Sequence, residues 1–443
     1  MQTVTIVGIG RVGLPLGLVL ADKGYKVYGI DVDQKRLGMI WAGNMPFLEE
    51  GAKELLDKYQ GTRFLAIHEQ VMPQVIEKSD IVLITLGTPI DSNFSPNISQ
   101  INEFFQKSKT SFKKGQLIIL RSTISPGVTR HVKRFMEENT GFVVGKDIFL
   151  AYCPERIAEG KAVEELGEIP QIIGTFDKES SKLAADLFYK LTEVIHFSDP
   201  LSAELAKLYC NIYRYIEFAI GNEFMMIAED QGADIYEVLR IANEGYKRNG
   251  IRSPGFTAGP CLVKDSFFLL DKSPYLELMT AAWRINENIP GFVVKKIKEK
   301  LGELVGKKIA ILGLAFKKNI DDSRYSLTPK LENHFISEGA IVSVHDPFLE
   351  SMSLESCLMD ADALIVATNH DVFGELNLQD IRGFVKQNCL IADLWNLYRY
   401  GKIVYPLEEY FGKNVSEKEA FSNLKANGRD KKNLKSQRII LGS

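Results

Sequence analysis

Short apolar runs alternate with longer, periodically apolar stretches through the first 200 residues of the chain. A short run bounded by turn residues is typical of a buried strand, whereas apolar residues three or four positions apart are typical of a helix. Strands that alternate with helices form a parallel sheet. We therefore predict a doubly wound α/β domain whose strands are residues 4–7, 25–30, 81–85, 117–122, 148–151, 172–173 and 194–197.

A different pattern begins near residue 202. Apolar residues that include Leu205, Leu208 and Ile212 recur at helical spacing, and Gly221 is the first Gly or Pro to follow them. A helix of this length is longer than a crossover between two strands requires, so it predicts a spine between two domains. Helical patterns continue to about residue 300.

The opening pattern returns at Lys308. The run KIAILGLAF is an apolar strand that leads into a turn at Gly313, AIVSVHDP is a strand that ends in an acid, and ADALIVATNH and CLIADLWN supply two more strands. The residues from Lys413 on are weakly periodic and rich in Lys and Asn, which predicts a mobile tail, although RIIL near the end could dock. The expected α/β architecture has two Rossmann-like doubly wound domains (residues 1–200 and 301–412) joined by a central long-helix domain (201–300), with a polar tail (413–443).

The composition narrows the classes of function. Hydrophobic residues make up 45% of the 443 residues and charged residues 25%, as in ordinary globular proteins. The net charge of −3 provides no basic field for nucleic acid, and no apolar stretch is long enough to span a membrane. The five cysteines are scattered without a CxxC pair and the six histidines are dispersed, which argues against disulfides and a metal site and for the reducing cytoplasm.

Residues 8–13, GIGRVG, follow the first predicted strand and open a helix. In this context Gly8 permits a tight turn, Gly10 lets the backbone approach a pyrophosphate, and Gly13 lets the helix pack on the strand. Asp31 ends the second strand, where its carboxylate would accept hydrogen bonds from the adenosine ribose and repel a 2′-phosphate. The motif therefore predicts NAD rather than NADP. The expected cofactor site is made of Gly8, Gly10, Arg11, Val12, Gly13, Asp31, Arg36, Thr85, Thr88 and Thr123, although an ordinary strand-end turn explains Thr85 and Thr88 equally well.

The predicted long helix carries a pair of polar residues. Lys207 and Asn211 are four positions apart and share one face, with Arg214 a further turn along. Two such groups place donors around one point, which suits an oxyanion or a water molecule. A solvated helix face is the alternative interpretation of the same residues.

Cys261 stands out among the five cysteines. Gly259 and Pro260 fix the backbone before it, and Asp265 follows four residues later, so one helical turn could bring the acid to the thiol. A lone cysteine is most often an inert buried side chain. The rigid loop and the acid make Cys261 a better candidate nucleophile than the other four.

Seven motifs in order resemble the UDP-glucose/GDP-mannose dehydrogenase family over nearly the whole chain. They are GIGRVGLPLG, GTP at residues 87–89, STISPG, CPERIAEG, ELAKLYCN, PGFTAGPCLVKD and ILGLAFKKNIDDSRYS. The resemblance implies an NAD-binding domain, a central helical dimerisation domain and a C-terminal domain that closes on a nucleotide sugar. It also implies a homodimer and a four-electron oxidation of the C6 hydroxymethyl group of the sugar to a carboxylate, with two NAD molecules used in turn.

The resemblance further implies catalytic roles for individual residues. Cys261 would be the nucleophile that forms a thiohemiacetal and then a thioester, because a thiolate adds readily to an aldehyde and a thioester can be hydrolysed. Lys207 and Asn211 would stabilise the developing oxyanion. Asp265 and Thr123 would position water, with Asp265 as a candidate base.

Other residues resemble contacts to the substrate. Glu155 and Glu159 match acidic positions near the sugar, and Glu155 is also a catalytic candidate. Lys317 and Arg324 resemble contacts to the nucleotide sugar, where Arg324 could fork onto a phosphate. Arg248 resembles an arginine that reaches the substrate of the partner subunit. The expected substrate-binding set is Glu155, Glu159, Lys207, Asn211, Arg248, Gly259, Lys317 and Arg324.

The chain departs from the family pattern in two places. The family usually has Glu before the Ser-Thr pair, where this chain has Arg121, and it commonly reads Gly-Gly-x-Cys where residues 259–261 read Gly-Pro-Cys. CPERIAEG resembles the N-acetylhexosamine branch, whereas Lys264 and Asp265 are closer to the UDP-glucose branch. We expect UDP-N-acetylmannosamine or UDP-N-acetylglucosamine as the substrate, with UDP-glucose as the alternative.

Two other functions fit parts of the sequence. A two-electron hydroxyacid or polyol dehydrogenase would need no nucleophile, so a Cys261→Ser change would leave its turnover nearly intact. A non-catalytic NAD-binding regulator would explain the glycine motif, but it would have no use for Cys, Lys, Asn and Asp together.

Overall fold

The computed structural model describes residues 1–91, 95–248, 250–272 and 275–411. They form two compact units, each assembled from separate stretches of the chain. The first consists of Met1–Glu223, Thr257–Asn288 and Ala315–Leu327, and the second of Phe224–Phe256, Ile289–Leu314 and the chain from Thr328 on. The residues predicted as a central domain, 201–300, are divided between the two units.

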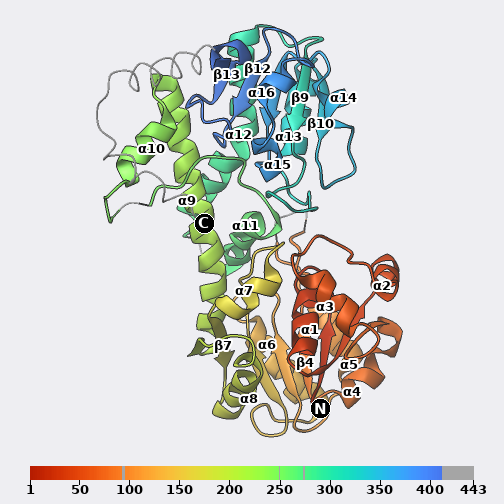
Figure 1. The fold of residues 1–443 in the computed structure, drawn as a ribbon. Helices are drawn as coiled ribbons and strands as arrows, with labels where there is room; N and C mark the ends of the chain where they lie inside the picture. The colour runs from red at the N-terminus through yellow and green to blue at the C-terminus, as the bar shows by residue number, and fades with distance from the viewer. Residues whose placement is uncertain (92–94, 249, 273–274, 412–443) are drawn as a thin grey trace, which may run out of the picture. The chain divides into compact units, whose positions relative to one another are not determined.

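An eight-stranded sheet forms the centre of the first unit (Figure 1). Its strands lie in the order β3-β2-β1-β4-β5-β6-β7-β8, and every neighbouring pair is parallel except β6 and β7. All the strands predicted for this region are present, and β3 is an additional edge strand. The strands are β1 (Thr3–Val7), β2 (Lys26–Asp31), β3 (Phe64–His68), β4 (Ile81–Ile84), β5 (Leu117–Leu120), β6 (Phe149–Tyr152), β7 (Gln171–Thr175) and β8 (Ile195–Ser198).

Alternate residues of the central strands pack into two separate cores. Ile6 of β1 and Leu83 of β4 belong to one core, whereas Val7 and Val82 belong to the other. Because successive side chains of a strand point to opposite faces, the sheet is buried on both sides, as a doubly wound fold requires. The helices of this part are α1 (Gly13–Asp22), α2 (Gln34–Trp41), α3 (Ala52–Tyr59), α4 (Met72–Lys78), α5 (Ser99–Ser108), α6 (Val128–Thr140), α7 (Ala162–Glu168) and α8 (Lys178–Phe188), with a 3₁₀ turn at Glu69–Val71.

The predicted long helix is confirmed as α9 (Pro200–Gln231), which continues through Gly221. Within the first unit, Leu208 and Ile212 of this helix pack with Phe268 in a buried apolar cluster. The predicted helical pattern does not continue unbroken to residue 300, since a loop separates the next two helices. These later elements are α10 (Ile235–Asn243), α11 (Pro260–Asp265), a 3₁₀ turn (Phe267–Lys272) and α12 (Glu277–Leu301).

A five-stranded sheet in the second unit repeats the opening turn. The N–H of Gly313 donates to the carbonyl oxygen of His345 at 2.8 Å, and the N–H of Leu314 donates to Asp346 at 2.6 Å. The strand order is β10-β9-β11-β12-β13, with only β13 antiparallel. The elements are β9 (Lys308–Leu312), α13 (Thr328–Ser337), β10 (Ile341–His345), α14 (Leu354–Leu358), β11 (Ala363–Val366), α15 (Asp371–Gly374), α16 (Leu378–Ile381), β12 (Leu390–Asp393) and β13 (Val404–Pro406).

The described residues contain neither a membrane-spanning helix nor a cluster of metal-ligating side chains. No helix among them combines the length and the apolar character needed to cross a bilayer. No group of three or more His, Cys, Asp or Glu side chains among them is arranged to hold a metal ion. The predicted tail, residues 413–443, and its RIIL segment lie outside the described residues.

Candidate active site

Three glycines shape the turn after β1. Gly8 has a φ of +94°, which L side chains rarely adopt, and its N–H donates to the carbonyl oxygen of Ile30 at 2.8 Å. A Cβ on Gly13 would lie 2.1 Å from the carbonyl oxygen of Gly8, so α1 packs against the turn only with glycine at this position. A Cβ on Gly10 would meet no protein atom within 4 Å. The turn is therefore packed against protein at Gly8 and Gly13 and open at Gly10.

The open side of this turn fits a dinucleotide pyrophosphate. Val12 stands at the N-cap position of α1 and no side chain caps this helix end. Leu14 donates its N–H to the carbonyl oxygen of Gly10 at 3.0 Å and Pro15 has no N–H, so the positive end of the helix dipole is what favours an anion here. Gly10 adds the space for a phosphate to come close to the backbone.

Asp31 lies at the end of β2, next to the glycine turn. Its side chain is buried, and Oδ2 accepts hydrogen bonds from the N–H of Ile9 at 3.0 Å and from Nη1 of Arg36 at 2.7 Å. Oδ1 accepts from the N–H of Asp33 at 3.0 Å. The structure thus brings the predicted Asp31 and Arg36 together, while their contact with a ribose stays a prediction.

Two of the three predicted threonines, Thr85 and Thr88, hold backbone through their hydroxyl groups. The hydroxyl of Thr85 donates to the carbonyl oxygen of Gly8 at 2.5 Å, and that of Thr88 to the carbonyl oxygen of Thr123 at 2.6 Å. Nζ of Lys264 donates to the carbonyl oxygen of Thr88 at 2.8 Å. Lys264 therefore ties α11 to the predicted cofactor site, a role that we did not expect from the sequence.

Arg11 faces carboxylates rather than open space. Its Nη1 lies 2.9 Å from Oδ1 of Asp321, and its Nη2 donates to the main-chain oxygen of Asp321 at 2.9 Å. Its Nε lies 3.3 Å from Asp322 and 3.8 Å from Glu159. Asp321 and Asp322 were not predicted as site residues, although both belong to the NIDDSR part of a family motif. The binding of Arg11 to a cofactor stays a prediction.

The loop before Cys261 depends on a glycine. Gly259 has a φ of +108°, and a Cβ there would lie 2.5 Å from the ring of Phe316. The N–H of Gly259 donates to the carbonyl oxygen of Tyr325 at 3.3 Å. Pro260 then occupies the first turn of α11, where its missing N–H costs nothing. The loop therefore presents the exposed thiol of Cys261 at the start of a short helix.

Lys207 and Asn211 meet the acid that follows Cys261. Both are buried on α9, and Nδ2 of Asn211 donates to Oδ2 of Asp265 at 2.6 Å. Asp265 is completely buried, and its Oδ1 accepts no hydrogen bond from any described protein group. The charge of Lys207 acts on both Cys261 and Asp265. The alternative interpretation of a solvated helix face is therefore wrong for Lys207 and Asn211.

Opposing charges act on the thiol and on the acid. The protein atoms packed around Cys261 desolvate its sulfur and, together with the charge of Asp265, raise the pKa of the thiol above its ordinary value. Lys207 and Lys264 oppose this rise. Burial also raises the pKa of Asp265, against the two lysines and the hydrogen bond from Asn211. A neutral thiol and a carboxyl of raised pKa suit proton exchange within the site.

Glu204 anchors the loop that carries Thr123. Its carboxylate, one turn before Lys207, accepts hydrogen bonds from the N–H of Gly127 at 2.6 Å and from the N–H and hydroxyl of Thr129 at 2.8 and 2.6 Å. The carboxylate also satisfies the positive end of α6. The sequence motif ELAKLYCN contains this residue, but its spacing gave no sign of the role.

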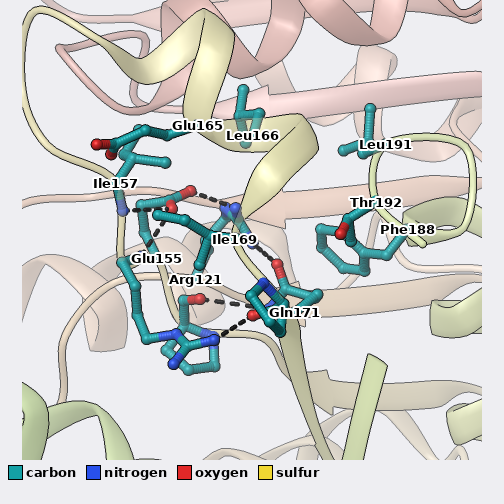
Figure 2. Close-up of a pocket in the computed structure, with 13 residues that line it drawn as sticks. Arg121, Glu155, Ile157, Glu165, Leu166, Ile169, Gln171, Phe188, Leu191 and Thr192 are labelled. Carbon is teal, nitrogen blue, oxygen red and sulfur yellow. Dashed lines mark hydrogen bonds and ion pairs between the residues drawn. The ribbon is translucent and has the colours of Figure 1, made fainter. Parts of the chain in front are cut away.

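Both oxygens of Glu155 are bound by protein groups. Oε1 accepts hydrogen bonds from the N–H groups of Arg156 at 2.7 Å and Ile157 at 3.0 Å, and Oε2 is paired with Arg121. Figure 2 shows Arg121 between Glu155 and Gln171 on one side of a pocket in the first unit. The structure gives no contact between Glu155 and Cys261 among the described residues.

Glu159 lies among cations of the segment Ala315–Leu327. Nζ of Lys317 donates to its main-chain oxygen at 3.0 Å, and Nη2 of Arg324 lies 3.5 Å from its carboxylate. Burial and the neighbouring Asp322 raise the pKa of Glu159 to about 7, and its charge in turn acts on Cys261. The predicted Glu159, Lys317 and Arg324 are therefore brought together.

Arg248 belongs to the second unit and is not part of this group. It is exposed, and its guanidinium lies 5.3 Å from the ring centroid of Tyr246. Its predicted reach to a partner subunit stays a prediction.

The glycine turn and the thiol with its buried acid have the chemistry of an NAD-dependent oxidoreductase. Three models of the UDP-glucose/GDP-mannose dehydrogenase family match the chain: the NAD binding domain at residues 2–192, the central domain at 201–288 and the UDP binding domain at 310–400. The chain belongs to this family, as the motifs predicted, and it is an NAD-dependent nucleotide-sugar dehydrogenase.

Relatives with defined names resemble the chain over most of its length. It is 30% identical to a UDP-N-acetyl-D-mannosamine dehydrogenase of Methanocaldococcus jannaschii, covering 89% of this chain and 92% of the relative. The solved UDP-D-ManNAc dehydrogenase of Pyrococcus horikoshii has a TM-score of 0.83 at 29% identity, covering 89% of this chain and 96% of that one. The UDP-N-acetyl-mannosamine dehydrogenase of Staphylococcus aureus has a TM-score of 0.79 at 28% identity, covering 89% and 95%.

Alanine at Gly10 and at Gly13 should separate cofactor binding from packing. Gly10→Ala meets no protein atom, so we expect the free energy of unfolding to change by less than about 0.5 kcal/mol and NAD affinity to fall at least ~10-fold. Gly13→Ala forces a clash with the carbonyl oxygen of Gly8, which should cost about 1–3 kcal/mol of stability. Urea unfolding and calorimetric titration with NAD measure the two effects. Unchanged NAD affinity in Gly10→Ala would mean that the cofactor does not bind this turn.

Two neighbouring charges should change the reactivity of Cys261 in opposite directions. Asp265→Asn removes an anion that raises the thiol pKa, so the thiolate fraction at about pH 8 rises and alkylation by iodoacetamide becomes roughly two- to tenfold faster. Lys207→Met removes a cation that lowers this pKa, so alkylation becomes slower. Mass spectrometry of the Cys261 peptide against pH gives both rates. Changes in the same direction would contradict the arrangement of charges described here.

Proposed function

We propose that the protein oxidises the C6 hydroxymethyl group of a UDP-N-acetylhexosamine, with UDP-N-acetylmannosamine as the first candidate, to the carboxylate. One observation carries the proposal: an exposed thiol at Cys261 shares its surroundings with a fully buried acid at Asp265, one oxygen of which accepts no hydrogen bond from the described protein groups. The names of the relatives support the choice of sugar.

Cys261 supplies the covalent step in the proposed reaction. Gly8, Gly10, Gly13 and Asp31 would hold NAD, which would supply the hydride acceptor for each of the two oxidations. The Cys261 thiol first loses its proton to solvent. The thiolate then adds to the carbonyl carbon of the aldehyde that the first oxidation leaves, so a C–S bond forms and the carbonyl oxygen takes the negative charge. Nζ of Lys207 and Nδ2 of Asn211 donate hydrogen bonds to that oxygen. Loss of the second hydride from the same carbon leaves a thioester on Cys261.

Asp265 completes the reaction as the base. Its Oδ2 is held by Asn211, and its Oδ1 is available to a water molecule. Asp265 takes a proton from this water while the water oxygen attacks the thioester carbonyl, and the C–S bond then breaks to return the thiol. A raised pKa makes the carboxylate a better proton acceptor than an exposed aspartate. Thr123, whose carbonyl oxygen is bound by Thr88, positions the same water in this proposal.

Lys317, Arg324 and Glu159 hold the substrate in this proposal. The two cations surround the segment that carries Glu159 and suit the diphosphate of a nucleotide sugar. Gly259 keeps the backbone close to the sugar, and Arg248 reaches the substrate of the partner subunit.

The protein is proposed to be a homodimer. Tyr209, Tyr213 and Ile220 of α9 lie on one helical face and are 54%, 64% and 40% exposed. Exposed apolar stripes of this kind mark protein contacts. The ranges of the family models support an NAD-binding domain at residues 1–200, a helical dimerisation domain at 201–300 and a nucleotide-sugar domain at 301–412. A thiol nucleophile requires a reducing compartment, which supports the cytoplasm.

NADH yield tests the reaction and the sugar. With UDP-N-acetylmannosamine as the limiting substrate, we expect two NADH per sugar, since a four-electron oxidation transfers two hydrides. UDP-N-acetylglucosamine, UDP-glucose and GDP-mannose form the comparison panel. Cys261→Ser should lower acid formation by at least about 10³-fold, because serine at its ordinary pKa is a poor nucleophile. One NADH per sugar, or a Cys261→Ser variant that keeps its turnover, would contradict the proposed covalent intermediate on Cys261.

Light scattering coupled to size-exclusion chromatography tests the dimer. The wild type should elute with twice the chain mass, and Tyr213→Asp should shift it to the monomer because a charge would be buried in the interface. Tyr275→Asp, at an 81% exposed tyrosine outside this helix, is the matched control and should stay dimeric. A monomeric wild type would overturn the proposal.

A further inference from the structure

We propose that Arg121 is a positioning residue, which fixes through Glu155 the backbone segment that carries Glu159, and that Glu155 neither accepts nor donates a proton in the reaction. The inference rests on the proposed function for the meaning of the site, but its geometry stands in the first unit alone. Arg121 is one of the two places where the chain departs from the family pattern.

Arg121 is held through the two terminal nitrogens of its guanidinium, while its Nε has no hydrogen-bond partner among the described residues. It follows β5 directly and is only 2% exposed. Nη1 donates to the carbonyl oxygen of Cys153 at 3.0 Å and to Oε1 of Gln171 at 2.9 Å, and the guanidinium stacks 5.1 Å from the ring centroid of Phe188 (Figure 2). Nη2 is left to pair with Glu155. A planar fork held in this way points at one place only.

Glu155 passes this restraint to the main chain. Arg121 binds one carboxylate oxygen, and the other accepts the N–H groups of Arg156 and Ile157 at 2.7 and 3.0 Å. A general base must offer an oxygen to the reacting proton. Both oxygens of Glu155 face donors of the protein instead, so this carboxylate is suited to holding a loop.

The loop that Glu155 holds leads to the site. The next residue, Ala158, donates its N–H to Glu165 at 2.5 Å, and Glu159 follows. Lys317 binds the main-chain oxygen of Glu159 at 3.0 Å, and the Glu159 carboxylate acts on the charge of Cys261. Arg121 thus acts on Glu159 through Glu155 and the main chain of residues 156–158. Arg121 itself contacts neither Cys261 nor Asp265 among the described residues.

Three substitutions separate positioning from proton transfer. Glu155→Gln keeps an acceptor for the two N–H groups and removes the charge. Arg121→Lys keeps a cation without the planar fork, and Arg121→Met removes both charge and fork. Arg134→Met, at an exposed arginine of α6, is the matched control.

Hydrogen–deuterium exchange of the whole protein measures directly whether Arg121 fixes the segment that carries Glu159. In Arg121→Met the amides of residues 154–160 that carry a hydrogen, from Glu155 to Gly160, should exchange at least about tenfold faster than in the wild type, because their anchor is lost. Arg121→Lys should lie between the two, and Arg134→Met should match the wild type. Unchanged exchange of this segment in Arg121→Met would overturn the proposal. If Arg121→Met does not fold by circular dichroism, the comparison of Arg121→Lys with wild type decides the same question.

Steady-state kinetics with UDP-N-acetylmannosamine test whether Glu155 transfers a proton in the reaction. Glu155→Gln should lower kcat less than about tenfold and leave every ionisation in the kcat pH profile in place. Arg121→Met should act mainly through KM, as expected when a binding segment is loosened. A loss of kcat of about 10²–10⁴-fold in Glu155→Gln, with one ionisation missing from the profile, would make Glu155 the general base and overturn the proposal.

The two proposals fail in different ways. A wild type that forms no NADH from any nucleotide sugar removes the proposed function, while the exchange of residues 154–160 still decides whether Arg121 fixes this segment. A wild type that forms two NADH, with exchange unchanged in Arg121→Met, keeps the function and removes the positioning role.

Discussion

A hydrogen bond between two buried side chains, from Asn211 to Asp265, joins the long helix to the short helix that begins beside Cys261. A hydrogen bond to a buried carboxylate contributes about 1.5–3 kcal/mol, and loss of the donor would leave a buried charge with one partner fewer. The contact fixes which oxygen of Asp265 is occupied and leaves the other available. The proposed chemistry depends on this difference between the two oxygens of Asp265: Oδ2 is held by Asn211, and Oδ1 can accept a proton.

Two arginines of the first unit differ in the parts of the chain that their contacts connect. Arg121 is completely enclosed and joins elements of the Rossmann sheet to each other, whereas Arg11, at the glycine turn, meets Asp321 and Asp322 from a segment more than 300 positions later in the chain. The acids beside these cations belong to loops that carry predicted substrate contacts. Electrostatic pairing therefore sets loop positions at the site, and apolar packing sets the position of the sheet.

Periodicity predicted the buried strands and the long helix because their apolar runs have one dominant period. It missed β3 and β13, which each lie at an edge of a sheet, and β13 has only three residues. Local spacing predicted that Lys207 lies on one helix with Asn211 and that Cys261 lies on another with Asp265, since the members of each pair are one helical turn apart. The partners of Arg11, Arg121 and Glu204 are tens to hundreds of residues away, so no local pattern reveals them. The family motifs indicated that such residues matter without giving their contacts.

The first unit is discontinuous along the chain, which imposes an order on biosynthesis. A nascent chain that has emerged as far as residue 200 contains every strand of the eight-stranded sheet. It contains neither Cys261 nor the segment Ala315–Leu327, whose Asp321 and Asp322 neutralise Arg11. Because domains form from the N-terminus during translation, Glu159 is the one carboxylate of this group that is made early, and Arg11 lacks Asp321 and Asp322 until the ribosome has passed residue 327. NAD can therefore reach the folded turn before the two acids that later pair with this arginine have been synthesised.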